Sequence, residues 1–418
     1  MRSHLFCDAQ PSLLRLSGVI LLAIWKNRNS APVNNTTPSP RLLSLDVFRG
    51  FVIAAMILVT DPGTYAHTFH QLRHADWDGA TATDMIFPAF LFMVGLAIPF
   101  SFASQVDRHA TRAALLLRIV RRAVVLFVLG LAVNGFYQYH WQTLRIPGIL
   151  QRIAVCYLVC ALIFLLVQHT AKRAAILVTL AFATLVVYWA ILKFAPVPGF
   201  GAGHLDSYTN FPAYVDRSVF GINHLWAYGT TPGRGVTYDS EGILSTIPAL
   251  FTMLIGILAG NWVRKPPARP DAGIALGLFL PGVALAAGGL VLSPLMPLNK
   301  RILTPTFALF STGVALMVFA ILYFAVDVRR LRRGVTPLLV LGTNAIFAFV
   351  LSSVLTTLLA IHFVENGQGQ SPHGWANDHL FATWLTPNLA SLAYALVVVA
   401  LNIALVYPLY RKRIFLRA

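Results

Sequence analysis

Ten apolar blocks, each about twenty residues long, constrain the fold of this chain more than any other feature of its sequence. A bilayer offers no water to backbone N–H and C=O groups, so crossing segments must satisfy those groups internally, as helices do. Only 11% of the 418 residues are charged, well below the share typical of soluble domains. The sequence therefore predicts an all-α polytopic transmembrane bundle of about ten spans. The blocks lie near residues 43–60, 82–103, 115–135, 148–168, 173–194, 243–262, 272–293, 302–326, 335–361 and 387–409.

The blocks divide the chain into a tail, residues 1–40, and a membrane domain, residues 41–418. The tail contains a short apolar run, Leu13 to Trp25, which is interrupted by Arg15. It is open whether this run forms an eleventh span, an interfacial helix or the remnant of a signal segment. The longest hydrophilic stretch, residues 195–242, is rich in glycine, proline and tyrosine and is interpreted as an ordered loop of the membrane domain.

Basic residues are concentrated in alternate connections between the blocks. The chain carries 32 lysines and arginines and a formal net charge of +17. Because cytoplasmic loops of membrane proteins are enriched in lysine and arginine, this asymmetry predicts that both termini are cytoplasmic. The polar loops 61–81, 195–242 and 362–386 are then outside. The charge is thus interpreted as a topology signal, and no nucleic acid partner is expected.

The loop between the first two blocks is dense in groups that carry chemistry. A histidine can act as general base or nucleophile near neutral pH, and a carboxylate can orient its ring. The candidate histidines are His67, His70 and His74, and the candidate carboxylates are Asp61, Asp76, Asp78 and Asp84. Two other interpretations stay open: an ordinary solvated loop, or a metal site, because the three histidines would share one face of a helix.

A second set of polar side chains lies within or at the mouths of the apolar blocks, where charges are costly and usually have a partner or a function. It comprises Asp46, Arg49, Gln151, Arg152, Lys300, Arg301 and Asn344. The cations are candidates for an anionic ligand such as a phosphate-bearing cofactor. The alternatives are an Asp46–Arg49 ion pair, snorkelling of the other cations, and helix packing by Asn344. Those other cations could also pair with an acid among Asp61, Asp76, Asp84 and Glu241. These patterns alone do not separate an enzyme from a transporter.

Several of these segments carry a resemblance to one family. The matching stretches are RLLSLDVFRG at 41–50, HADWDG at 74–79, TDMIFP at 83–88, FMVG at 92–95, PGILQRIA at 147–154, YDSEGILSTIPA at 238–249 and NKR at 299–301. In this order they resemble the heparan-α-glucosaminide N-acetyltransferase family, and in particular bacterial members without a large luminal domain. One departure is that family members often have asparagine just after the first helix, where this chain has Thr60 and Asp61.

The resemblance implies a multi-pass acetyltransferase in a bacterial inner membrane. It would move an acetyl group from cytosolic acetyl-CoA to the amine of a glucosamine-type sugar at the outer face. The central histidine would be His74, oriented by Asp61, Asp76 or Asp84, and no metal is expected. The residues expected to hold acetyl-CoA are Asp46, Arg49, Gln151, Arg152, Lys300, Arg301 and Asn344. A homodimer is left open as the assembly.

Two other functions remain as alternatives at this point. One is a transporter of N-acetylglucosamine or related sugars, which broken helices and internal repeats would favour. The other is an O-acyltransferase for envelope glycans. For the leading interpretation, the residues do not choose between an acetyl-imidazole intermediate and direct transfer in a ternary complex.

Overall fold

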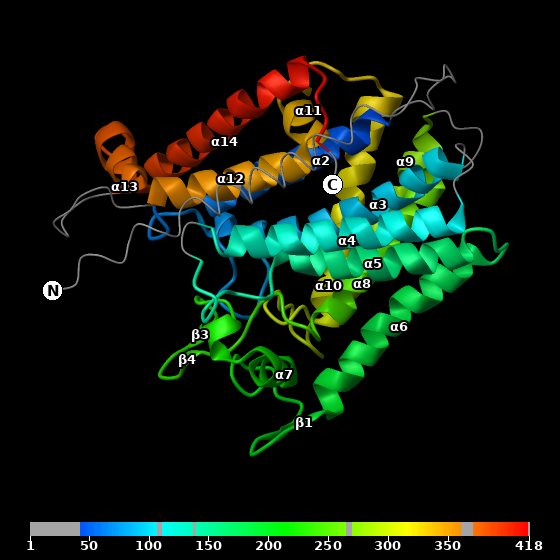
Figure 1. Ribbon diagram of the computed structural model, residues 1–418, viewed down its shortest axis with the longest axis horizontal. Coiled ribbons are helices and arrows are strands. Elements are labelled where there is room, and N and C mark those ends of the chain that lie inside the picture. Colours follow the sequence, from blue (N-terminus) through cyan, green and yellow to red (C-terminus); the bar gives the residue numbers. More distant parts are fainter. Residues whose placement is uncertain (1–41, 107–110, 137–138, 265–269, 361–370, 417–418) are drawn as a thin grey trace.

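The computed structural model describes residues 42–106, 111–136, 139–264, 270–360 and 371–416 (Figure 1). The predicted tail and its apolar run at 13–25 lie outside these residues. Eight described helices are long and apolar enough to cross a membrane. In the helix assignment they are α2 (Leu43–Thr60), α3 (Ile86–Val106), α5 (Ile149–Val167), α6 (Arg173–Phe194), α8 (Thr246–Val263), α9 (Ala272–Val291), α10 (Pro305–Tyr323) and α14 (Pro387–Arg411).

Two further elements complete the bundle. Helix α4 (Arg112–Asn134) has 23 residues and packs against α5, and its arginines are concentrated in its first half. Helices α11 (Thr336–Thr343) and α12 (Ala345–Ala360) together have the length and composition of one span, although they meet at an angle of 91°. The prediction of an all-α polytopic bundle is confirmed.

Glycines allow the helices to approach closely. A Cβ atom built on Gly95 of α3 would lie 2.1 Å from the carbonyl oxygen of Met253 on α8, and one on Gly256 would lie 2.3 Å from the carbonyl oxygen of Phe92. In a bilayer the attraction between helices comes from such close packing, since lipid is as apolar as the side chains. The core of the bundle contains Phe48, Phe92 and Phe319, whose rings meet at centroid distances of 5.6 to 6.2 Å.

The loops at one end of the bundle are joined to one another, and we call this the loop end. It consists of residues 61–82, 139–148, 195–245 and 292–304. Gly79 N donates to the carbonyl oxygen of Leu298 at 2.7 Å, and Ile146 N donates to that of His224 at 3.0 Å. The indole Nε1 of Trp77 donates to the carbonyl oxygen of Leu205 at 3.0 Å. Contacts between residues distant in sequence therefore hold this end together.

The long stretch 195–242 contains short elements of its own. Helix α7 (Phe211–Phe220) and the 3-10 turn η3 (Ile222–His224) follow the hairpin β1 (Pro196–Val197)–β2 (Gly201–Ala202) and precede β3 (Thr230–Thr231)–β4 (Gly235–Val236). They lie beyond the ends of the long helices at the bottom of Figure 1. Asn210 caps α7 by accepting a hydrogen bond from Ala213 N.

The expected continuous block at 335–361 needs correction, because the helix breaks at Asn344. Asn344 Nδ2 donates to the carbonyl oxygen of Ile414 at 3.0 Å, and its Oδ1 accepts from Leu416 N at 2.8 Å. The amide thus binds the backbone that follows α14, close to α11 (Figure 1). Tertiary hydrogen bonds stabilise a bend that apolar periodicity alone does not reveal.

The close packing of α3 on α8 makes a stability prediction. We expect Gly95→Ala to lower the thermal unfolding midpoint of the protein in nanodiscs, corresponding to about 1–3 kcal/mol of destabilisation from overpacking. Gly288→Ala on α9 is the matched control, since a Cβ there meets no atom of the described residues within 4 Å. Equal midpoints for the two variants would contradict this account of the packing.

Candidate active site

A histidine–carboxylate pair lies where the first loop enters α3. His74 Nδ1 is 2.6 Å from Asp84 Oδ1, and Asp84 belongs to the 3-10 turn η2 (Thr83–Met85). Asp84 is buried at 1% side-chain exposure, whereas His74 is 38% exposed. Since a carboxylate only accepts hydrogen bonds, Nδ1 carries the proton and Nε2 has a free lone pair. The imidazole is thereby fixed in the tautomer that a general base or nucleophile requires.

The fold of the loop is arranged around the Asp84 carboxylate. Its Oδ2 accepts hydrogen bonds from Ala75 N at 3.1 Å and Thr81 N at 3.0 Å, and the Thr81 hydroxyl lies 3.0 Å away. Gln71 contributes its side-chain oxygen to Ala82 N at 3.0 Å. A buried carboxylate is stable only when such donors surround it. The donors that stabilise Asp84 also fix the position of His74.

The pKa of His74 lies below its ordinary value. Burial is the largest cause, followed by the positive charge of Lys300, and Arg301 acts in the same direction. The hydrogen bond and the charge of Asp84 oppose this shift without cancelling it. The imidazole is therefore neutral at pH 7, which is the form that can accept a proton or attack a carbonyl group.

Lys300 and Arg301 reach this site through the turn that precedes α10. Asn299 organises the turn: its Nδ2 donates to Asp78 Oδ1 at 3.0 Å and its Oδ1 accepts from Ile302 N at 3.1 Å. The turn is thus hydrogen-bonded to the His74 loop. Burial lowers the pKa of Lys300, and the nearby Glu241 offsets this only in part.

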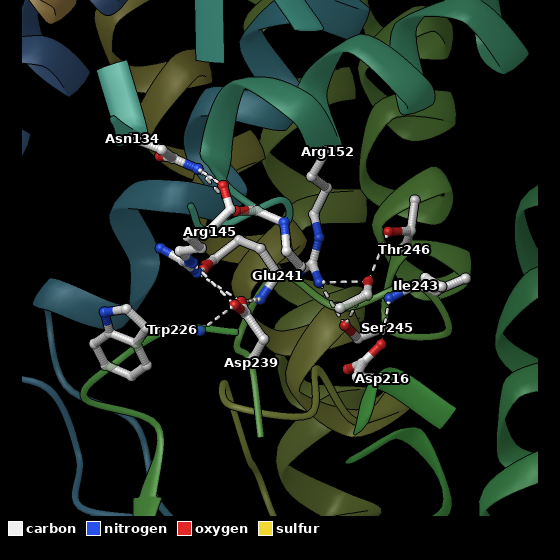
Figure 2. Close-up of polar contacts among 12 residues, drawn as sticks. Asn134, Arg145, Arg152, Asp216, Trp226, Asp239, Glu241, Ile243, Ser245 and Thr246 are labelled. Carbon is white, nitrogen blue, oxygen red and sulfur yellow. Dashed lines mark hydrogen bonds and ion pairs between the residues drawn. The ribbon is translucent and has the colours of Figure 1, made fainter. Parts of the chain in front are cut away.

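Arg152 lies near Lys300 and belongs to the first turn of α5 (Figure 2). Its Nη2 donates to the carbonyl oxygen of Gly242 at 3.1 Å and to the Ser245 hydroxyl. The Asp216 carboxylate on α7 accepts from Ile243 N at 2.9 Å, beside the same segment. Residues 242–245 therefore link α5, α7 and α8.

An ion-pair network next to Arg152 joins two loops (Figure 2). Arg145 forms a bidentate pair with Asp239, at 2.9 and 2.6 Å, and its Nη2 also contacts the Glu241 carboxylate. Asp239 in turn accepts from the backbone N–H groups of Trp226 at 2.7 Å and Glu241 at 2.8 Å. The network fixes Glu241 near Lys300.

Sequence reasoning identified Glu241 as a partner for cations but missed Arg145 and Asp239. A signal was available, since Arg145 is a basic residue in a loop on the side poor in basic residues. Asp239 is buried and Arg145 is partly buried. A bidentate pair in such a place is stable because each charge has a partner and further hydrogen bonds.

Several buried polar atoms in the first turn of α5 and in the loops before α8 and α10 have no hydrogen-bond partner among the described residues. They are both amide atoms of Gln151, Nε of Arg152, Oγ of Ser240, and Nε and Nη1 of Arg301. Buried polar groups are normally paired, so a concentration of unpaired donors indicates a place where a polar ligand binds. Three of the four residues belong to the set expected to hold acetyl-CoA.

The other expected site residues lie elsewhere. Asp76 is exposed. Asp61 is buried beside Thr356 and His373, in a cluster of its own. Asp46 and Arg49 pair at 3.2 Å near the start of α2, at the end opposite the loop end. Both amide atoms of Asn344 are bonded to the C-terminal backbone. The expected acetyl-CoA residues are therefore divided between the two ends of the bundle.

The metal interpretation of the first loop gains no geometric support. Across the part of the chain that the structure describes, no group of three or more His, Cys, Asp or Glu side chains is arranged to hold a metal ion. His74 makes its close contact with Asp84 alone of the loop carboxylates.

The helices and the site together define the class of this protein: a polytopic membrane protein with a histidine–aspartate pair and basic side chains at one end. The chain belongs to the heparan-alpha-glucosaminide N-acetyltransferase family, because the model of that family's catalytic part matches residues 41–288. The resemblance inferred from the sequence motifs is thus confirmed.

Two curated relatives extend the match over most of the chain. The human heparan-alpha-glucosaminide N-acetyltransferase is 29% identical over 420 aligned positions, which cover 90% of this chain and 60% of the human protein. The mouse protein of the same name is 27% identical over 432 positions, covering 92% of this chain and 61% of the mouse protein. The chain thus spans about 60% of the length of these relatives.

The Arg145 network predicts a strong dependence of stability on Asp239. Asp239→Asn removes the buried charge of this pair and leaves the partly buried Arg145 with Glu241 alone, so we expect a loss of on the order of 3 kcal/mol. The unfolding midpoint in nanodiscs measures this loss. The exposed Asp76→Asn serves as control, and an equally small shift in both variants would contradict a structural role for the network.

Proposed function

We propose that this protein transfers an acetyl group from acetyl-CoA to the amine of an amino sugar at the loop end of the bundle. The hydrogen bond between His74 and Asp84 is the observation that carries this proposal, because it supplies an oriented imidazole in a neutral form. Membership of the family and the printed names of the human and mouse relatives support it.

His74 Nε2 would accept the proton of the amine as the amine nitrogen attacks the thioester carbonyl carbon. The carbon–sulfur bond then breaks, and the proton on Nε2 passes to the thiolate of coenzyme A. In a second route Nε2 itself attacks the carbonyl carbon and the thiolate leaves, giving an acetyl-imidazole. The amine then attacks the acetyl carbon, the carbon–Nε2 bond breaks, and the amine proton passes to the released Nε2. Asp84 has the same role in both routes, holding the ring and stabilising its positive form.

The cations beside His74 would stabilise negative charge on the carbonyl oxygen of the tetrahedral intermediate. Lys300 and Arg301 both lie close enough to His74 to lower its pKa. Nε of Arg152 and Nε and Nη1 of Arg301 are buried and have no partner among the described residues. They are donors of the kind that preorganised sites direct at developing charge. Gln151 would contribute its amide to the same region.

The division of the expected residues between two ends suggests how the donor would lie. Acetyl-CoA is elongated, with its phosphates at one end and its thioester at the other. With the thioester at His74, the phosphates would lie toward the end that holds Arg49 and Asp46. A guanidinium group suits phosphate binding. We assign Asn344 to holding the C-terminal segment, since both of its amide atoms are engaged there.

The orientation in the membrane is also part of this proposal. The distribution of basic residues favours a loop end on the outer face and cytoplasmic termini. A bacterial cytoplasmic membrane is the compartment we propose.

Acetyl transfer by the purified protein in nanodiscs tests the function. With labelled acetyl-CoA and glucosamine, we expect label on the sugar, and we expect His74→Ala to reduce the rate by about 10²–10⁴-fold, the usual contribution of a positioned base. His67→Ala, in the same loop and exposed, is the matched control. Full activity of the His74 variant would exclude its assignment as the base.

The lowered pKa of His74 gives a pH prediction. The base acts in its deprotonated form, so the acidic limb of kcat/KM is expected below pH 6.5, the ordinary pKa of histidine. Lys300→Met removes a positive charge that lowers this pKa, and the limb should move to higher pH. Lys300→Arg keeps the charge and should keep the limb in place. The exposed Lys193→Met is the control, and a limb that moves equally in both methionine variants would refute the electrostatic link.

One observation favours a second candidate, a sugar transporter. The 91° break between α11 and α12 is a feature that transporters use to form binding sites. We rank the transporter lower because the polar side chain at the break, Asn344, is already hydrogen-bonded to the C-terminal backbone. If the protein neither transfers acetyl groups nor binds acetyl-CoA, uptake of N-acetylglucosamine into proteoliposomes becomes the decisive assay.

A further inference from the structure

A second buried polar cluster lies at the start of the first loop, apart from His74. Its centre is Asp61, which directly follows α2 and is 6% exposed. The carboxylate oxygen Oδ2 of Asp61 is buried without a hydrogen-bond partner among the described residues. A buried carboxyl group with an unpaired oxygen is costly as an anion. Its protonation state therefore affects how stably the neighbouring segments can cover it.

Asp61 is covered in part by a segment from the C-terminal part of the chain. Helix α13 (Pro372–Ala376) and the π-turn η5 (Asn377–Phe381) form a segment, residues 371–381, that we call the strap. His373 Nε2 donates to the carbonyl oxygen of Pro62 at 2.7 Å. A Cβ atom on Gly63 would lie 2.2 Å from Asn377 Oδ1, so the strap rests directly on the backbone of the loop.

The first turns of α14 extend this contact. Gly63 N donates to the carbonyl oxygen of Ser391 at 3.1 Å, and Thr64 N donates to the Ser391 hydroxyl at 3.1 Å. Residues 61–64 are thus held between the strap and α14. Because the same residues begin the loop that carries His74, docking of the strap restrains that loop at its start.

The groups that face Asp61 come from four elements. They are His373 of α13, Thr356 of α12, Tyr394 of α14 and Tyr65 of the loop itself. The His373 ring contacts the Tyr394 ring edge-on, with a centroid distance of 4.8 Å. His373 is the basic group among them, and both phenols are neutral near pH 7.

We propose that Asp61 is a proton-linked latch: the strap docks more tightly on residues 61–64 when the Asp61 carboxyl group is protonated. The geometry carries the proposal, because docking removes this carboxyl group from water without giving both of its oxygens a partner.

The direction follows from the linkage of binding and proton uptake. Burial raises the pKa of Asp61 from 3.8 to about 6, and Thr356 and His373 oppose this only in part. With the strap released, the carboxyl group meets water and returns toward its ordinary pKa. The docked form therefore binds the proton more tightly, and docking strengthens as pH falls through 6. Between about pH 8 and about pH 5 the docking constant is expected to rise about tenfold.

Hydrogen exchange of the full chain in nanodiscs, read by mass spectrometry, tests the latch independently of any transferase activity. The probes are the peptides that cover residues 62–66 and 371–381. Asp61→Asn keeps the shape of the side chain but is neutral at every pH, so docking of the strap should not depend on pH in this variant. Its exchange rates also give the intrinsic pH dependence of hydrogen exchange, against which the wild type is compared. We expect protection in the wild type, relative to Asp61→Asn, to rise about tenfold from about pH 8 to about pH 5.

Two further variants identify the group that titrates. His373→Gln keeps a donor for the Pro62 carbonyl and should retain the pH response, as should the exposed Asp76→Asn. A wild-type response equal to that of Asp61→Asn would overturn the proposal. Loss of the response in His373→Gln would overturn it as well, because the histidine would then be the titrating group.

Discussion

The loop end of this protein depends on the hydrogen bonds to the buried carboxylate of Asp84. This carboxylate lies where the first loop enters the bundle, and backbone N–H groups of that loop together with Thr81 surround it. An uncompensated anion at this place would be too costly, so the loop folds around the carboxylate. His74 is one of the groups that satisfy Asp84, which is why the histidine is oriented before any substrate is present. The stability of the loop and the geometry of the candidate base thus have one cause.

The loop end also shows how a membrane protein can hold several cations close together. Arg145 is neutralised by Asp239 and Glu241, and Glu241 also faces Lys300. Arg301 lies over the ring of Trp226, at 5.2 Å from its centroid. Acids, carbonyl oxygens and an aromatic face share the charge, but the neutralisation is incomplete. Burial and, after it, this remaining positive potential lower the pKa of His74. The same potential would favour negative charge on a bound carbonyl oxygen.

Much of the architecture was predictable because it depends on local properties. Apolar blocks of bilayer length predict helices, and the motifs around His74 and Asp84 are short enough to be recognised in the sequence. The choice among Asp61, Asp76 and Asp84 was not predictable, because it depends on how the loop is held by Leu298 and Leu205 from distant segments. The break at Asn344 escaped for the same reason, since its partners lie some seventy residues further along the chain. Asp61 was a candidate for orienting His74, yet the structure gives it other neighbours.

The most direct measurement is an electron cryo-microscopy structure of the full chain in nanodiscs with an acetyl-CoA analogue whose thioester is replaced by an unreactive ketone. The account predicts the carbonyl carbon of the analogue about 3–3.5 Å from His74 Nε2, the spacing of a near-attack geometry. It also predicts the carbonyl oxygen toward Lys300 and Arg301, and the phosphates toward the end that holds Arg49. An analogue bound with its acetyl group away from His74, or with its phosphates on Lys300 and Arg301, would contradict the central role assigned to the His74–Asp84 pair.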